Sequence, residues 1–246
     1  MKRTLFLILA GISVLTLFLP ACGNSGNTIR VATDATWPPF EYVDEQNHIV
    51  GFDIDLMDAI AAKAGLKIEY INVGFDPLLA GMATGTYDAA ISSITIKPER
   101  AENMLFTEPY YVAGQMIVIR TNNTIITGES TLAGKALGAQ LGTTGEALAQ
   151  EVANANVKSY NQIGLAIQDL MNGQIDAVIC DTPIAENYVK KNSATLKTIG
   201  GALTTEDYGI AVAKGKQDLL QKLNDGLKAV KAEGLIDTLV QKWLAS

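Results

Sequence analysis

Gly85-Thr-Tyr-Asp88-Ala-Ala-Ile91-Ser-Ser93 and Gly173-Gln-Ile-Asp176-Ala-Val-Ile179-Cys-Asp181 are two copies of one pattern, Gly-x-x-Asp-Ala-x-Ile. Each copy follows an apolar helical segment and ends in polar residues. We therefore expect two similar halves, each with a strand that follows a helix. In open parallel sheets, ligands bind beyond the carboxyl ends of the strands. Ser93 and Asp181 are accordingly expected to face a shared crevice between the halves.

The rest of the chain alternates short β-branched runs with amphipathic segments, which is typical of an α/β protein with mostly parallel sheets. One helix is predicted over 53–64, and two more over 217–244, divided near Gly234. Another helix is predicted to begin at Asp76-Pro77, with aspartate as N-cap and proline in the first helical position, and to end at Gly85. The predicted strands are 29–33, 67–73, 87–92, 115–120, 135–140, 157–160, 175–179 and 208–213.

The N-terminus has the form of a secretory signal over residues 1–21. Lys2 and Arg3 precede an apolar run from residue 5 to residue 19. That run is shorter than the roughly 20 residues that span a bilayer, so we expect it to be removed, with an uncleaved anchor as the alternative. Leu19-Pro20-Ala21-Cys22 resembles the bacterial lipobox, in which the cysteine is acylated, although Pro20 departs from the usual small or hydroxyl residue. Residues 22–27 predict a tether, and lipid on Cys22 predicts a membrane-anchored protein outside the cytoplasm.

Charge and cysteine content restrict the function further. Without Lys2 and Arg3, 17 of the 19 basic residues face 26 acidic ones, a net charge of 17 − 26 = −9. Phosphate binding requires a basic surface, so no nucleic acid partner is expected. With Cys22 acylated, Cys180 has no disulfide partner. No group of His, Cys and acidic residues has metal-ligand spacing, and we expect neither a metal nor a cofactor.

A third strand end also carries a possible anion site. The predicted strand 135–140 leads into Leu141-Gly142-Thr143-Thr144-Gly145-Glu146 and then a helix, whose first N–H groups are open to an anion. The stretch lacks the dinucleotide fingerprint and the phosphate-loop Gly-Lys-Ser/Thr. An ordinary glycine turn with a threonine cap is the alternative.

Six stretches of the chain together resemble the amino-acid-binding members of the periplasmic solute-binding proteins, family three, over residues 28–246. The resemblance implies the bilobal periplasmic-binding-protein type II fold, with two α/β lobes joined by a two-strand hinge. The stretches, in the family's order, are Val31-Ala-Thr-Asp34-Ala-Thr-Trp37-Pro-Pro-Phe40-Glu41, Gly51-Phe52-Asp53-Ile54-Asp55-Leu56-Met57-Asp58-Ala59-Ile60-Ala61, Ser92-Ser93-Ile-Thr95-Ile-Lys-Pro-Glu-Arg100, Phe106-Thr-Glu-Pro-Tyr110-Tyr111, Gly142-Thr143-Thr144 and Asp181-Thr-Pro.

The resemblance implies that one lobe is interrupted by the other. Residues 28–116 plus 209–246 would form lobe 1, and residues 117–208 would form lobe 2. The crossing strands are expected near 115–119 and 204–210, and the carboxy-terminal helices are expected to cover lobe 1.

The resemblance also implies how a free amino acid is held. Arg100 would bind the carboxylate bidentately, and Thr144 would add a carboxylate contact through its backbone N–H and hydroxyl. Asp181 would meet the ammonium, with Thr95 Oγ and the Ser93 carbonyl as further acceptors. These contacts come from both lobes, so binding would close them. Taken singly, Arg100 could be a surface charge and Asp181 a helix cap.

Further positions correspond to the family's side-chain pocket. Two aromatic rings could hold a guanidinium between them, one aspartate supplies negative charge, and Gln140 stands where glutamine-binding relatives carry a lysine. We therefore expect arginine to be favoured, other basic amino acids next, and glutamine as the alternative ligand. The pocket residues are Asp34, Trp37, Phe75 and Gln140, with Glu41 and Cys180 as further candidates.

Two other functions on this fold are alternatives. A dehydratase-like enzyme has little support, because the only histidine, His48, lies in a polar turn and completes no Ser/His/Asp or Cys/His set. Carboxylate catalysis by Asp34, Glu41 or Asp181 is the remaining route, and we expect no enzyme. A sensory ligand-binding domain would need a membrane segment and a signalling module after the lobes. We expect a monomer that delivers its amino acid to an ABC transporter permease.

Overall fold

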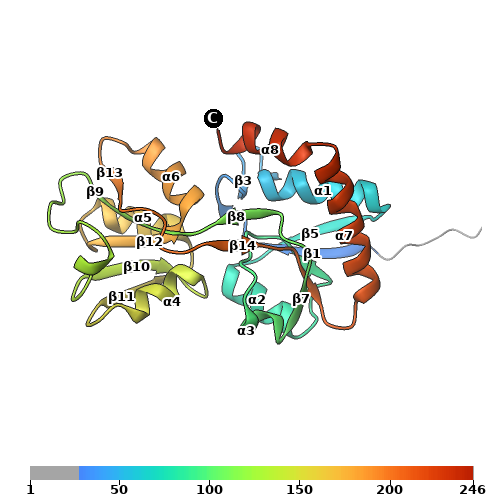
Figure 1. The fold of residues 1–246 in the computed structure, drawn as a ribbon, viewed down its shortest axis with the longest axis horizontal. Coiled ribbons are helices and arrows are strands. Elements are labelled where there is room, and N and C mark those ends of the chain that lie inside the picture. The colour runs from blue at the N-terminus through green and yellow to red at the C-terminus, as the bar shows by residue number, and fades with distance from the viewer. Residues whose placement is uncertain (1–27, 246) are drawn as a thin grey trace, which may run out of the picture.

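The computed structural model describes residues 28–245 and shows two α/β lobes connected by extended segments (Figure 1). This is the predicted bilobal type II arrangement. The signal sequence, Cys22 and the tether lie outside the described residues, so their predictions stay as they are. Within residues 28–245, none of the helices has both the length and the apolar character required to cross a bilayer.

The first lobe is built on a five-stranded sheet in the order β5-β1-β6-β15-β7. β1 pairs in parallel with β5 and β6, whereas β15 lies antiparallel between β6 and β7. A strand from the end of the chain therefore completes the first sheet. The strands are β1 (Ile29–Thr33), β5 (Ile68–Asn72), β6 (Ala89–Ala90), β7 (Met104–Phe106) and β15 (Ala211–Ala213).

The second sheet repeats this plan in the order β11-β10-β12-β9-β13. β10 pairs in parallel with β11 and β12, and β9 lies antiparallel between β12 and β13. β6 and β12, the strands of the repeated sequence pattern, hold the same place in the two sheets. The strands are β9 (Gln115–Arg120), β10 (Ala136–Gln140), β11 (Asn156–Tyr160), β12 (Ala177–Asp181) and β13 (Leu196–Ile199).

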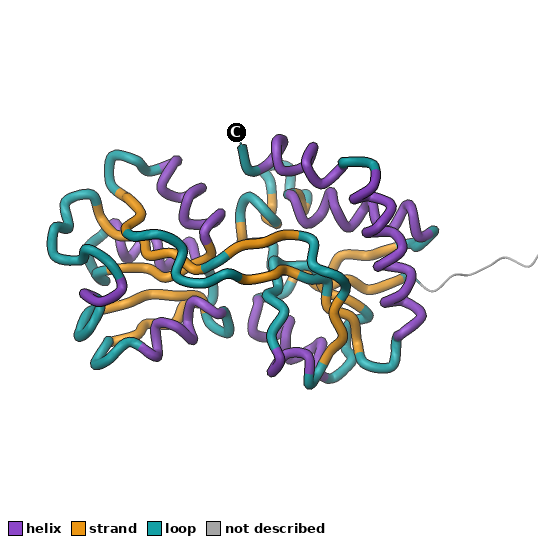
Figure 2. The backbone as a smooth tube through the Cα atoms, viewed as in Figure 1, coloured by secondary structure: helices purple, strands orange, loops and turns teal. Residues whose placement is uncertain are grey.

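Two antiparallel strands, β8 (Tyr111–Ala113) and β14 (Glu206–Tyr208), run side by side between the lobes (Figure 2). The second crossing was predicted near 204–210, where β14 lies. The first was predicted too late, near 115–119, because β9 pairs on both edges within the second sheet and leaves β8 to make the crossing. The lobe boundaries at 116/117 and 208/209 stay a prediction.

The helices lie mostly where apolar periodicity predicted them, and one start is different. α2 has Gly74 as its N-cap, so Asp76 and Pro77 lie inside the first turn. Buried Phe75 packs with Leu78 and Met82 on one helix face, and first-turn N–H groups need no intrahelical partner. The helices are α1 (Phe52–Ala64), α2 (Phe75–Ala83), α3 (Pro98–Ala101), α4 (Thr144–Glu151), α5 (Ile163–Met171), α6 (Thr182–Lys191), α7 (Gln217–Ala232) and α8 (Leu235–Trp243), with a 3-10 turn at Glu129–Thr131.

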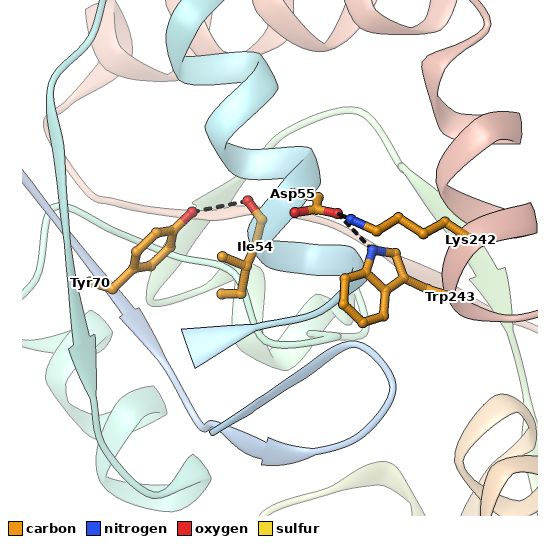
Figure 3. A network of polar contacts seen from close by, with 5 residues as sticks. All are labelled: Ile54, Asp55, Tyr70, Lys242 and Trp243. Atoms are coloured by element: carbon orange, nitrogen blue, oxygen red, sulfur yellow. Dashed lines mark hydrogen bonds and ion pairs between the residues drawn. The ribbon is translucent and has the colours of Figure 1, made fainter. Parts of the chain in front are cut away.

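The two carboxy-terminal helices cover the first lobe, as predicted. α7 lies so close to α1 that a Cβ on Gly226 would be 2.7 Å from the Ile60 carbonyl oxygen. α8 is attached to α1 through Asp55, whose Oδ2 accepts hydrogen bonds at 2.7 Å from both Lys242 Nζ and Trp243 Nε1 (Figure 3). The last two helices thus pack against the lobe whose sheet β15 joins.

A small antiparallel sheet, absent from the predicted elements, lies beside the first lobe. It comprises β2 (Thr36–Trp37), β3 (Glu41–Val43) and β4 (Ile49–Val50). Strands of two or three residues are too short to show an alternating pattern. Their consequence for the site is that Trp37 and Glu41 are paired across β2 and β3.

Candidate ligand-binding site

A cavity lies between the carboxyl ends of the two sheets. All ten residues predicted for the site line it, together with Ser92 and Thr143. The lining residues are Asp34, Trp37, Glu41, Phe75, Ser92, Ser93, Thr95, Arg100, Gln140, Thr143, Thr144 and Asp181.

Strand ends explain why these residues meet. Asp34 follows β1, Ser93 follows β6, Gln140 ends β10 and Asp181 ends β12. Ser93 has a left-handed backbone, with φ of 48°, and its N–H donates to Asp53 Oδ2 at 2.7 Å. Such a conformation in a residue other than glycine persists only where its surroundings hold it.

Arg100 reaches into the cavity and contacts both lobes. Its Nη1 donates to the Thr95 carbonyl at 2.8 Å and its Nη2 to the Gly142 carbonyl at 3.1 Å. The guanidinium also lies 5.4 Å from the centre of the Phe75 ring. A guanidinium has five N–H donors, so donors remain for a ligand. Desolvation by burial lowers the pKa of Arg100, and Asp181 acts in the opposite direction. The surface-charge interpretation of Arg100 is therefore wrong.

Asp181 occupies the N-cap position of α6 but makes no capping hydrogen bond. Its Oδ1 accepts from Gln115 Nε2 at 2.9 Å, and its Oδ2 accepts a short hydrogen bond from the Tyr208 hydroxyl. Burial raises the pKa of Asp181 to about 6. The helix-cap alternative is wrong, and the carboxylate is instead held at the cavity wall.

Thr95 and Thr144 share a partner that sequence reasoning missed. Their hydroxyls donate to the same oxygen, Glu206 Oε2, at 2.8 and 2.7 Å. The Thr144 hydroxyl also accepts from Gln115 Nε2 at 2.9 Å. A hydroxyl has one proton, so in this arrangement Thr144 Oγ1 cannot donate to a ligand carboxylate as expected. Its backbone N–H, in the first turn of α4, is the remaining donor.

The opposite end of the cavity is acidic. Asp34 Oδ2 accepts from Gln140 Nε2 at 2.7 Å, a direct hydrogen bond between the lobes, and Oδ1 accepts from Thr36 at 2.8 Å. Asp34 is only 2% exposed, and its burial raises its pKa. Both side chains that donate to Asp34, those of Gln140 and Thr36, are neutral.

Two further carboxylates lie behind Asp34. Glu41 accepts from Ser92 Oγ at 2.9 Å, and Asp53 accepts from Ser93 N–H and from the Tyr110 hydroxyl at 2.9 Å. Burial and the neighbouring Asp53 raise the pKa of Glu41 well above its usual value, and burial raises that of Asp53 to about 7. Hydroxyl, amide and backbone N–H groups, all neutral, hold this acidic end.

The aromatic and cysteine predictions have mixed outcomes. Trp37 lines the cavity, and its buried Nε1 has no hydrogen-bond partner among the described residues. Arg100 lies over one face of the Phe75 ring, and the sandwich of a ligand group between Trp37 and Phe75 stays a prediction. Cys180 packs in the core instead of the cavity, and burial raises its pKa well above the usual value.

The residues that sequence reasoning missed have weak signals in the chain. Ser92 adjoins the predicted Ser93. Asp53 lies in the stretch 51–61 that resembles the family, but no ligand contact was predicted for it. Glu206 carried no signal, because its partners are distant in sequence.

His48 lies in an exposed turn beside Asp44. Across residues 28–245, no three side chains of His, Cys, Asp and Glu are gathered as a metal site.

Comparison with known proteins identifies the family of the chain. The family model of the bacterial extracellular solute-binding proteins, family 3, matches residues 29–246. A putative ABC transporter arginine-binding protein 2 of Escherichia coli (strain K12) is 36% identical over 229 residues, covering 89% of this chain and 92% of the relative.

Two solved structures are also similar. An ancestral arginine-binding protein bound to arginine is 41% identical, with a TM-score of 0.84, covering 88% of this chain and 97% of that one. The ancestral amino acid-binding protein AncCDT-1, a precursor of cyclohexadienyl dehydratase, is 35% identical, with a TM-score of 0.82, covering 88% of this chain and 95% of that one.

Proposed function

The chain belongs to the bacterial extracellular solute-binding proteins, family 3, and we propose that it binds a free L-amino acid with a cationic side chain, arginine above the others. The two lobes enclose the ligand, and the loaded protein delivers it to an ABC importer. The relative from Escherichia coli and the arginine-bound ancestral protein support this proposal through what their names describe.

The observation that carries the proposal is the distribution of charge along the cavity. Arg100 and Asp181 at one end complement the carboxylate and ammonium that every free amino acid has. Asp34 and Glu41 line the other end, Asp53 lies behind them, and hydroxyl, amide and backbone N–H groups, which are neutral, donate to these acids. Burying a charge without a partner is costly, so a cationic ligand side chain suits this end.

Location and membrane attachment belong to the same proposal. The signal over residues 1–21 and the lipobox-like Leu19-Pro20-Ala21-Cys22 support a lipoprotein held outside the cytoplasm. A short tether over residues 22–27 would leave the lobes free to meet a permease. The expressed protein should incorporate labelled palmitate, and the variant Cys22→Ser should not.

Glutamine is the second candidate, and one feature favours it. Trp37 Nε1 is a buried donor without a partner in residues 28–245, and it could donate to the carbonyl oxygen of a glutamine side chain. The amide nitrogen would then donate to Asp34. This pairing leaves the acidic end without a cation, so we rank it below arginine.

Simple binding, without chemical change of the ligand, is also part of the proposal. The carboxylates that line the cavity accept hydrogen bonds from neutral donors. The relative from Escherichia coli and the precursor of cyclohexadienyl dehydratase are both binding proteins by name. Incubation with each amino acid followed by mass spectrometry should return the input molecule. A new product would show that the chain is an enzyme.

A thermal-shift screen of the mature protein against all twenty amino acids tests the ligand. Ligands that bind only the folded state raise its stability with occupancy. Arginine should give the largest shift, lysine and histidine smaller ones, and calorimetry on these ligands should give one site. A larger shift with glutamine would select the second candidate, and no shift with any amino acid would refute both.

A further inference from the structure

Glu206 lies in the hinge strand β14, behind the cavity wall, and its role is not accounted for by the ligand contacts above. It is 9% exposed. One oxygen, Oε2, accepts hydrogen bonds from Thr95 at 2.8 Å and Thr144 at 2.7 Å. Thr95 follows β6 of the first sheet, and Thr144 begins α4 of the second lobe. A carboxylate in the connecting strand therefore joins one threonine from each lobe.

The carboxylate is held in place from its other side. Its Oε1 accepts from Thr204 Oγ1 at 2.8 Å, within the same hinge segment. Gln115 Nε2, which donates to Asp181 at 2.9 Å, lies 3.4 Å from Glu206 Oε2. Glu206 is thus fixed by the chain and connected through Gln115 to the carboxylate proposed to meet the ammonium.

The direction of these hydrogen bonds determines what the two threonines can do. An ionised carboxylate only accepts, so each hydroxyl must donate its single proton to Glu206. Each hydroxyl oxygen can then offer only lone pairs to the cavity, which both residues line, and Gln115 Nε2 takes one of the two on Thr144 Oγ1. Acceptors without a competing proton suit an ammonium, which has three N–H donors.

We propose that Glu206 is a positioning residue, which orients a threonine hydroxyl from each lobe so that both oxygens accept from the ligand ammonium. The proposal rests on the proposed function. It assigns Thr144 Oγ1 to the ammonium rather than to the carboxylate. It also gives the negative charge in the hinge a role, because from there one oxygen reaches a threonine of each lobe.

The test uses arginine and 5-guanidinopentanoate, which is arginine without its ammonium. Glu206→Ala should weaken arginine binding by about 10- to 100-fold, the effect of losing hydrogen bonds to a charged group. The same variant should change binding of 5-guanidinopentanoate by less than about threefold, within the error of additivity. Glu206→Gln keeps an acceptor oxygen without the charge and should fall between for arginine.

Asp207→Ala is the matched control, since Asp207 is the exposed neighbour on the same strand, and it should bind both compounds as the unaltered protein does. Calorimetry on the full mature chain gives the affinities. If 5-guanidinopentanoate binds too weakly for direct calorimetry, displacement by arginine gives its affinity.

The proposal is overturned if Glu206→Ala loses the same affinity for the two compounds, or loses affinity for neither. In both cases, arginine binding by the unaltered protein leaves the proposed function intact. If Glu206→Ala does not fold, an unchanged ratio of the two affinities in Glu206→Gln overturns it equally. Failure of the unaltered protein to bind arginine would instead refute the proposed function.

Discussion

The two ends of the cavity differ in how their charges are balanced. At one end, Arg100 stands near Asp181 and Glu206, and each acts on the pKa of the guanidinium. At the other end, burial raises the pKa values of Asp34, Glu41 and Asp53, and the neighbouring Asp53 and Asp34 raise that of Glu41 further. The first end therefore suits a zwitterion of any kind, and the second selects among side chains. Substitutions at the two ends should separate these roles.

Arg100→Ala is expected to have the largest effect. It removes the partner of the ligand carboxylate, and loss of one member of a buried charge pair typically costs about 2–5 kcal/mol. Binding of arginine, lysine and histidine should all weaken by this amount in calorimetry. Arg100→Lys keeps the charge but not the planar fork, so it should recover part of the affinity. Near-normal affinity of Arg100→Ala would remove Arg100 from the site.

Asp34→Asn should have a smaller effect, and one that depends on the ligand. The asparagine keeps an acceptor oxygen for Gln140 or Thr36 but loses the charge. Arginine binding should weaken by about 1.5–3 kcal/mol, the range for hydrogen bonds to charged groups, whereas glutamine binding should weaken less, because the asparagine oxygen can still accept from its neutral amide. Competition calorimetry with both ligands measures the difference. Equal losses for arginine and glutamine would contradict a side-chain role for Asp34.

The effect of Asp53 should be seen in stability without ligand. Its pKa is raised from 3.8 to about 7, so between these values the folded protein holds a proton that the unfolded chain releases. This stabilisation is present below about pH 4 and is lost as the pH rises through about 7, at no more than about 1.4 kcal/mol per pH unit for one proton.

Asp53→Asn tests this titration, since asparagine keeps an acceptor for the Ser93 N–H and the Tyr110 hydroxyl. The decline in free energy of unfolding between pH 4 and pH 7 should become shallower, as measured by chemical denaturation across that range. Asp237→Asn, at an exposed position of α8, should keep the original slope. An unchanged slope in Asp53→Asn would show that Asp53 does not titrate there.

The sequence predicted the strand ends better than the connections between lobes. β1 and β9 have the predicted bounds because apolar, β-branched runs end there at polar residues. β12 lies two residues later than predicted, since Asp176 turns back to accept from the Ala136 N–H before the strand begins. Periodicity does not say which sheet a strand joins, and for that reason the first crossing was assigned to β9 instead of β8.

The candidate site likewise contains residues that the sequence predicts and residues that it does not. Residues at strand ends could be predicted, because the carboxyl ends of parallel strands meet at one edge. Glu206 could not be predicted, since its threonine partners lie 111 and 62 residues away in the sequence and come together only when the two lobes meet. The hydroxyl role of Thr144 failed for the same reason, because the partner that takes its proton was unknown.

A crystal structure of the mature protein grown with arginine tests the central claim most directly. The α-carboxylate should lie on the Arg100 guanidinium, the ammonium between Asp181 and the hydroxyl oxygens of Thr95 and Thr144, and the side-chain guanidinium on Asp34. An arginine bound in the reverse direction, or outside the cavity between the sheets, would contradict the assignment of the two ends.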